Sequence, residues 1–115
     1  MKKINLAITG CMGRMGRQII KSAKSDKNFK IVALTENRII NKKIHGLKPS
    51  LNTVEAFKKA SLIIDFTVPK CTFEVLKIAS KLKKRVVIGT TGFSKKDENL
   101  IKKYSKKYQF LRLGI

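Results

Sequence analysis

The fold of this chain is decided by the stretch Ile4-Asn5-Leu6-Ala7-Ile8-Thr9-Gly10-Cys11-Met12-Gly13-Arg14-Met15-Gly16. Its first half is mostly apolar and predicts a buried strand, and glycines then recur at every third position. Apolar residues follow at helical spacing (Met15, Ile19, Ile20 and Ala23). A buried strand, a glycine turn and a helix start together favour a phosphate-binding turn. Glycines let the backbone approach a pyrophosphate closely, and a helix N-terminus offers N–H groups and a positive dipole end.

The glycine spacing differs from the commoner Gly-x-Gly-x-x-Gly pattern, because Met12 stands where its second glycine would be. A turn of this kind also serves any tight connection between a strand and a helix. The strand before it and the helix after it make nucleotide binding the favoured interpretation.

Composition limits the class of protein. The chain has 115 residues and 43% hydrophobic residues, enough for a single domain with a modest core. No apolar run approaches the length of a membrane span, and the start Met-Lys-Lys followed by a strand lacks a signal-peptide core. We therefore expect a cytoplasmic protein with no membrane partner. Cys11 and Cys71 have no metal-ligand spacing, so we expect no metal site and favour buried, small side chains for both.

The net charge is +20, which suggests nucleic acid as a partner. However, the lysines are spread over the polar faces of the whole chain, and no zinc finger, RNA-binding aromatic signature or recognition helix is evident. We expect no specific nucleic-acid partner and a modest benefit for an anionic cofactor.

Strand and helix patterns alternate along the chain. Further strands are predicted at 30–35, 62–66, 85–89 and 110–113, and a basic loop runs from Glu36 to Ser50. A short helix through Val54, Phe57 and Ala60 is predicted to be capped by Asn52 with Glu55, and another helix to start at Pro69. Ser94 with Asp97 is expected to cap a helix with the inner face Leu100, Ile101, Tyr104 and Tyr108. The order predicts an α/β fold, a Rossmann-like doubly wound parallel sheet of about five strands with the order 3-2-1-4-5.

In such a sheet, ligands bind beyond the carboxyl ends of the strands. The segments that meet there are Gly10–Gly16, Glu36–Arg38, Phe66–Pro69 and Gly89–Phe93. Glu36 is suited to accept hydrogen bonds from the hydroxyls of an adenosine ribose, although a solvated surface acid is the alternative. Arg38, Lys42 and Lys43 lie close enough in sequence to pair with a 2′-phosphate.

Three segments, in order, resemble the N-terminal domain of the dihydrodipicolinate reductase (4-hydroxy-tetrahydrodipicolinate reductase) family. The glycine turn is similar to the family's cofactor turn. Asp65-Phe66-Thr67-Val68-Pro69 resembles its D-F-T-x-P segment, and Val87-Ile88-Gly89-Thr90-Thr91-Gly92-Phe93 matches its V-I-G-T-T-G-F segment. Another dinucleotide-binding protein would explain only the first of these segments.

The resemblance implies NAD(P)H-dependent reduction of 4-hydroxy-tetrahydrodipicolinate to tetrahydrodipicolinate, in lysine and diaminopimelate biosynthesis. It implies binding of NADH or NADPH, with the pyrophosphate at the glycine turn, the ribose at Glu36 and the nicotinamide near Gly89. The expected cofactor-binding residues are Gly10, Cys11, Met12, Gly13, Arg14, Met15, Glu36, Phe66, Thr67, Gly89, Thr90 and Thr91. Many members carry an arginine directly after the acid, whereas this chain has Asn37 there and Arg38 next, which leaves the choice between NADH and NADPH open.

The family continues into a second domain with the E-x-H-x-x-x-K and P-S-G-T segments and most tetramer contacts, and none of these is in this chain. His45, the only histidine, matches no catalytic position and is expected to be exposed. We therefore expect residues 1–115 to be an NAD(P)-binding domain without catalytic residues, inactive alone and tetrameric only with the second domain. The alternatives are a dinucleotide-binding module or redox sensor without catalysis, and a short-chain dehydrogenase. The latter needs Tyr-x-x-x-Lys, which neither Tyr104 nor Tyr108 provides.

Overall fold

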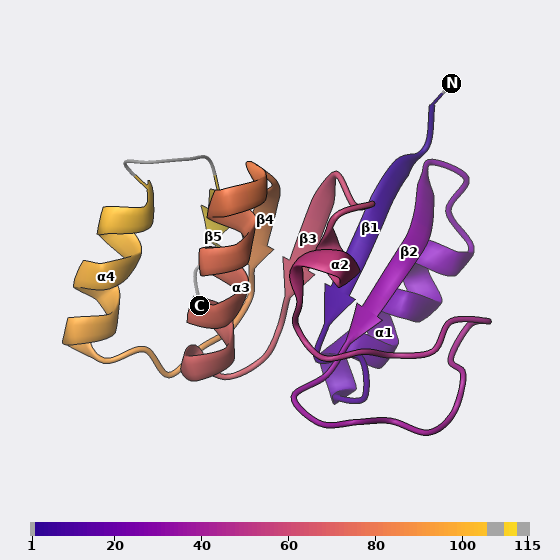
Figure 1. Cartoon of the computed structure of the whole chain (residues 1–115), viewed down its shortest axis with the longest axis horizontal. Helices are drawn as coiled ribbons and strands as arrows, with labels where there is room; N and C mark the ends of the chain where they lie inside the picture. Colours follow the sequence, from indigo (N-terminus) through magenta and orange to yellow (C-terminus); the bar gives the residue numbers. More distant parts are fainter. Residues whose placement is uncertain (1, 106–109, 113–115) are drawn as a thin grey trace.

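A computed structural model describes residues 2–105 and 110–112 of the chain. Strands and helices alternate, and every strand pairs in parallel with its neighbours (Figure 1). The elements are β1 (Ile4–Thr9), α1 (Arg14–Lys24), β2 (Phe29–Thr35), α2 (Val54–Phe57), β3 (Leu62–Asp65), α3 (Pro69–Leu82), β4 (Arg85–Ile88), α4 (Lys95–Ser105) and β5 (Phe110–Arg112). The predicted α/β doubly wound parallel sheet is confirmed. The interpretations of Tyr108 and Leu113 concern positions outside the described residues.

The predicted strand order was wrong. In the described part of the chain the sheet has five strands in the order β2-β1-β3-β4-β5, so β3 pairs with β1 and not outside β2. The right-handed crossover rule fixes the hand of each connection but not its direction along the sheet. The connection between β2 and β3 contains only the four-residue α2 and passes back over the sheet to the free edge of β1. The winding direction therefore reverses between β1 and β3.

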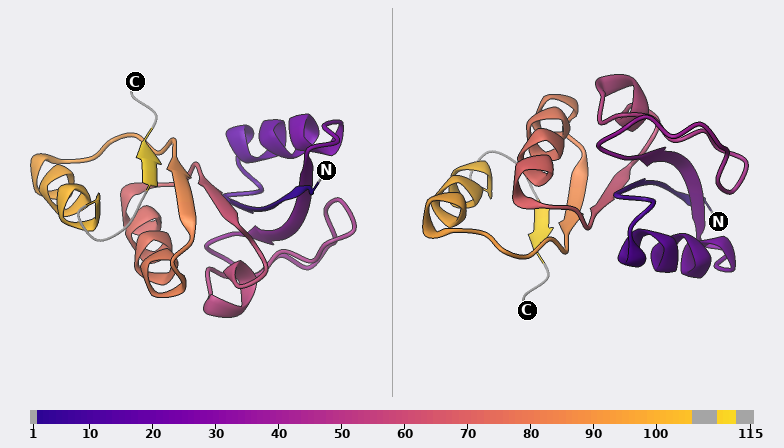
Figure 2. Two further views of the ribbon diagram at one scale, coloured as in Figure 1. Left: turned by 90° about the horizontal axis from the view of Figure 1, so that it is seen from above. Right: turned by 90° about the horizontal axis from the view of Figure 1, so that it is seen from below.

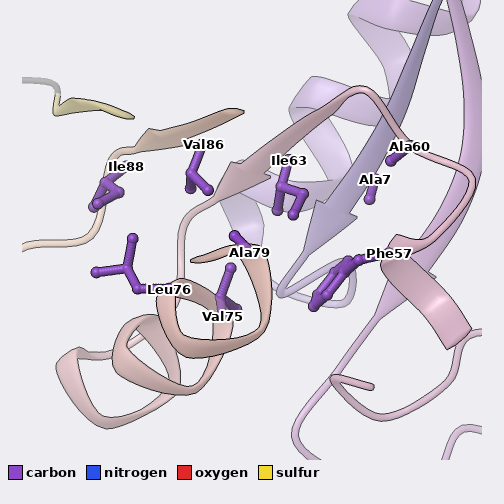
Figure 3. Packing of buried hydrophobic residues seen from close by; sticks show 9 residues of the cluster. All are labelled: Ala7, Phe57, Ala60, Ile63, Val75, Leu76, Ala79, Val86 and Ile88. Atoms are coloured by element: carbon purple, nitrogen blue, oxygen red, sulfur yellow. The ribbon is translucent and has the colours of Figure 1, made fainter. Parts of the chain in front are cut away.

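This reversal places helices on both faces of the sheet. Figure 2 shows α1 on one face, with α2 and α3 on the other. Residues of β1 alternate between the two cores: Leu6 and Ile8 pack on the α1 side, and Ala7 packs on the side of α2 and α3. The second core is shown in Figure 3 and contains Ala7, Phe57, Ala60, Ile63, Val75, Leu76, Ala79, Val86 and Ile88.

Helix α4 packs beside α3 through aromatic side chains. The ring of Phe73 stacks on that of Tyr104 at 6.5 Å between centroids and meets the edge of Phe93 at 6.0 Å. The sequence predicts both Leu100 and Ile101 on the buried face of α4. This is confirmed for Ile101, which is buried, and is wrong for Leu100, which is 39% exposed.

Two of the predicted helix starts are confirmed. Pro69 is the first residue of α3, and Ser94 and Asp97 exchange backbone-to-side-chain hydrogen bonds of 3.0 and 3.1 Å before α4. The predicted cap of α2 was wrong by one residue. The Thr53 hydroxyl accepts the N–H of Ala56 at 3.1 Å, because the Asn52 amide oxygen instead accepts the Thr35 hydroxyl at 2.5 Å.

Helix α1 packs through a narrower face than the spacing predicts. Gly16, Ile20 and Ala23 are buried, but Met15 is 46% exposed, so its predicted place on the inner face was wrong. His45 is exposed, as predicted, in a tight turn where its φ is 53°. Across residues 2–105, no helix is both long and apolar enough to cross a membrane.

Candidate functional site

The loops that follow β1, β2 and β3 meet at the carboxyl edge of the sheet, as the sequence predicts. They form a cleft where the winding direction reverses, the usual place for a ligand in a sheet of this kind. The cleft is lined by Gly10, Gly13, Glu36, Asn37, Phe66, Thr67, Val68 and Cys71, and it adjoins a second hollow lined by Leu51, Asn52, Lys70 and Glu74 together with Glu36, Asn37, Val68 and Cys71.

Two glycines of the turn are required by the fold. Gly10 has a φ of +64°, and a Cβ there would lie 2.7 Å from the carbonyl oxygen of Phe66. A Cβ on Gly16 would lie 2.1 Å from the carbonyl oxygen of Gly10, because α1 packs directly on the turn at this point. Neither position accepts a side chain without a shift of the backbone.

Gly13 differs from these two glycines. It is the exposed N-cap residue of α1, with an extended backbone (φ −77°, ψ 170°) that any residue adopts. Among the described residues, a Cβ there would lie within 4 Å of one atom, the Gly10 carbonyl oxygen, at a tight 3.3 Å. Gly13 gives α1 no side-chain cap, so the N-cap residue satisfies none of the first-turn N–H groups of the helix. Such a helix start suits an anionic group.

Glu36 connects the end of β2 to the glycine turn. Its Oε2 accepts the N–H of Met12 and its Oε1 accepts the N–H of Asn37, both at 3.0 Å. Each oxygen keeps a second lone pair for a further donor. The half-buried carboxylate is therefore fixed in the cleft in an orientation that could accept hydroxyls of a ligand.

Lys70 is a further cation near Glu36. It comes from the first turn of α3 and lines the same hollow as Glu36, whereas Arg38, Lys42 and Lys43 line neither hollow, and all four of these side chains are exposed. Sequence reasoning missed Lys70. The available signal was its place in a helix start at the carboxyl edge.

The loop after β3 packs on the loop after β4 through Phe66, Thr67, Gly89 and Thr90. The Phe66 ring packs over Gly89, where a Cβ would lie 2.0 Å from the ring, and the Gly89 N–H donates to the Asp65 carbonyl at 2.8 Å. The Thr67 N–H donates to the buried Thr90 hydroxyl at 2.8 Å.

Sequence reasoning also missed the group beneath these two loops. Asp65 is fully buried, and hydroxyls donate to its carboxylate from Thr9, Thr67, Thr72 and Thr90. The available signal was an acid that ends an otherwise apolar strand and therefore needs partners. The exposed Thr91, by contrast, stands at the surface of the edge.

The two cysteines are buried thiols, which agrees with the favoured interpretation of the sequence. Burial, followed by the charge of Glu36, raises the pKa of Cys11 from 9.0 to about 11. Burial, followed by the charges of Glu74, Asp65 and Glu36, raises the pKa of Cys71. Neither thiol has the lowered pKa of a nucleophile. Among the residues that the structure describes, no group of three or more His, Cys, Asp or Glu side chains could hold a metal ion.

A parallel sheet with a glycine turn after its first strand and an acid after its second defines a dinucleotide-binding domain of the dehydrogenase type. Comparison of the sequence identifies the family more closely. Residues 4–113 match the family described as "Dihydrodipicolinate reductase, N-terminus", and the chain belongs to this family of oxidoreductases.

Named relatives agree with this assignment. The chain is 67% identical over 114 residues to the 4-hydroxy-tetrahydrodipicolinate reductase of Pelagibacter ubique (strain HTCC1062), covering 99% of this chain and 44% of the relative. It is 37% identical over 111 residues to the enzyme of the same name from Bdellovibrio bacteriovorus, covering 96% of this chain and 44% of the relative. The chain thus spans somewhat less than half the length of these relatives.

Solved structures share the fold. A dipicolinate-bound dihydrodipicolinate reductase from Paenisporosarcina sp. TG-14 superposes with a TM-score of 0.70 at 23% identity, over 90% of this chain and 43% of that one. A D-galactose-1-dehydrogenase from Rhizobium etli superposes with a TM-score of 0.72 at 20% identity, over 96% of this chain and 37% of that one.

Proposed function

We propose that this chain is the NAD(P)-binding part of a 4-hydroxy-tetrahydrodipicolinate reductase of lysine and diaminopimelate biosynthesis. In that reaction NADH or NADPH donates a hydride, a proton is taken up, and 4-hydroxy-tetrahydrodipicolinate becomes tetrahydrodipicolinate and water. From the resemblance to the family, we expect the substrate-binding and tetramer-forming residues in the part of the relatives that this chain does not cover. The observation that carries the proposal is the hydrogen bond between the Met12 N–H and Glu36, which brings a ribose acceptor against a phosphate-binding turn.

The residues of this chain bind and orient the cofactor and carry out no proton transfer. The turn from Gly10 to Met15 takes the pyrophosphate through backbone N–H groups, and Glu36 takes the hydroxyls of the adenosine ribose. Phe66, Thr67, Gly89, Thr90 and Thr91 line the side of the nicotinamide. When bound, the cofactor supplies the hydride, and the protein determines which face of the ring meets the substrate.

A fluorescence titration with NADH tests the binding part of the proposal. The purified chain is expected to bind NADH weakly and to show no turnover of 4-hydroxy-tetrahydrodipicolinate. A folded chain that binds no dinucleotide would contradict the proposal, and so would turnover by the 115-residue chain alone.

A chimera tests whether the chain supports catalysis. Residues 1–115 would replace the matching part of the Pelagibacter ubique relative, to which they are 67% identical. The chimera is expected to reduce 4-hydroxy-tetrahydrodipicolinate with NADH or NADPH. A chimera that binds cofactor and folds but never turns over would indicate a dinucleotide-binding module without catalysis.

A further inference from the structure

Asp65 ends β3 beneath the carboxyl edge of the sheet, and its buried carboxylate has no hydrogen-bonding capacity left over. Oδ1 accepts the hydroxyls of Thr9 at 2.6 Å and Thr67 at 2.8 Å. Oδ2 accepts those of Thr72 at 2.5 Å and Thr90 at 3.0 Å. A carboxylate accepts about four hydrogen bonds, so these four hydroxyls saturate it.

The four donors come from separate parts of the chain. Thr9 is the last residue of β1, Thr67 lies between β3 and α3, Thr72 is in the first turn of α3, and Thr90 follows β4. Asp65 therefore joins the loops after β3 and β4 to the end of β1 and the first turn of α3.

One part of this network is a closed ring. Thr67 donates its hydroxyl to Asp65 and its N–H to the Thr90 hydroxyl, which in turn donates to Asp65. The ring fixes the loop after β3 relative to the loop after β4. The glycine turn begins directly after Thr9, which donates to Asp65, but it also has supports of its own, since Gly13 donates to Gly10 at 2.9 Å and Met12 donates to Glu36 at 3.0 Å.

Stability alone does not call for this arrangement. A buried carboxylate is costly to desolvate, and well-packed apolar residues of similar volume are often as stabilising. What an apolar residue at position 65 could not do is set the positions of the Thr67 and Thr90 hydroxyls in the two loops and, through Thr90, of the Thr67 N–H.

We infer that Asp65 is the positioning residue for the nicotinamide half of the cofactor site. It fixes Phe66–Thr67 and Gly89–Thr90 relative to each other, whereas the adenosine half depends on the glycine turn and Glu36. This inference rests on the proposed binding of NADH or NADPH, and it assigns the main support of each half of the ligand to a different acid, Asp65 or Glu36.

Asp65→Asn tests the inference, because the amide keeps the shape of the carboxylate but replaces one acceptor oxygen with a donor. Either orientation of the amide leaves two hydroxyls facing N–H groups. The dissociation constants of NADH and of ADP-ribose, which lacks the nicotinamide, are measured by calorimetry on the full chain, together with the melting temperature. We expect NADH to weaken about tenfold and ADP-ribose to change less than about twofold.

Ile63→Val is the matched control. Ile63 lies two residues earlier in β3, is fully buried in the core of Figure 3 and lies outside the network around Asp65. It is expected to lower the melting temperature and leave the ratio of the two dissociation constants unchanged.

A second variant tests the inference in case Asp65→Asn does not fold. Thr72→Val removes one donor to the Asp65 carboxylate at a buried residue that the proposed function does not place against the cofactor, and it is expected to weaken NADH selectively as well. Equal weakening of NADH and ADP-ribose by either variant would make Asp65 merely structural and overturn the inference. A wild-type chain that binds both ligands equally would also overturn it, whereas a wild-type chain that binds neither would refute the proposed function itself.

Discussion

The backbone N–H of Met12 lies 3.0 Å from Oε2 of Glu36, so the acid after β2 holds the middle of the glycine turn after β1. The same carboxylate accepts the N–H of Asn37. Glu36 therefore has a role in the protein before any ligand binds. A loss of cofactor binding in a Glu36 variant has to be separated from loosening of the turn.

Glu36→Ala is expected to lower the free energy of unfolding by about 1 kcal/mol, because the Met12 and Asn37 N–H groups lose a half-buried acceptor. Glu36→Gln keeps one acceptor oxygen within reach of Met12 and is expected to cost less. Urea denaturation of both variants measures the difference. Identical stabilities of wild type and Glu36→Ala would mean that the bond to Met12 contributes nothing to the fold.

The glycines of the turn are expected to separate folding from binding. Gly13→Val places a side chain on the open side of the turn, where the near atom among the described residues is the Gly10 carbonyl oxygen, 3.3 Å from the new Cβ. We expect this variant to fold with a modestly lower melting temperature, because valine is a poorer N-cap residue than glycine, and to lose detectable NADH binding. Gly16→Ala is expected to destabilise the protein strongly, because its Cβ would lie 2.1 Å from the Gly10 carbonyl oxygen.

Circular dichroism on heating and NADH titration, applied to both glycine variants, give the comparison. Cys11→Ala is the control within the same turn, since it shortens a buried side chain without adding volume. Gly13→Val with wild-type affinity would show that no phosphate lies against this turn.

Much of the fold follows from local sequence patterns. Runs of apolar residues predict the strands. Pro69 predicts the start of α3, and the spacing of Ser94 and Asp97 predicts the start of α4. The carboxyl ends of parallel strands meet at one edge of the sheet, and this general rule correctly predicts that Gly10, Glu36 and Phe66 line one cleft. These features depend on residues close in sequence or on a rule that holds for every parallel sheet.

The errors concern features that depend on distant partners. The position of β3 depends on where residues 36–61 cross the sheet, and no local pattern records this. The sequence predicts Asn52 as a helix cap, but its amide oxygen instead accepts a hydrogen bond from the hydroxyl of Thr35 at the end of β2. The importance of Asp65 was missed because its partners are as far as 56 residues away, at Thr9.

The raised pKa of Cys11 predicts a specific dependence on pH. The thiol is neutral in the folded protein up to about pH 11, whereas an unfolded thiol loses its proton near 9.0. Above pH 9 the unfolded state therefore binds fewer protons, and the stability due to this group falls as the pH rises toward 11. Cys11→Ala is expected to flatten the fall in stability between pH 9 and 11, measured by urea denaturation. Equal slopes for the variant and the wild type would contradict the raised pKa.

The choice between NADH and NADPH is expected to depend on Glu36 and Lys70, which line the same hollow. A carboxylate accepts a ribose 2′-hydroxyl and repels a 2′-phosphate, so NADH is expected to bind at least as tightly as NADPH. Lys70 opposes this effect as a cation that lines the hollow. Its side chain is exposed and screened by salt, as are those of Arg38, Lys42 and Lys43, but these three line neither hollow.

Glu36→Gln isolates the charge, because it keeps an acceptor for Met12. A hydrogen bond to a charged group contributes about 1.5–3 kcal/mol, so NADH is expected to weaken by about one to two orders of magnitude. NADPH is expected to bind as before or more tightly, while Lys70→Gln should weaken NADPH alone. Lys42→Gln, on the exposed loop, is the control and should change neither cofactor. The measurement is a set of dissociation constants at physiological salt, and equal weakening of both cofactors by Glu36→Gln would show that Glu36 does not contact the ribose.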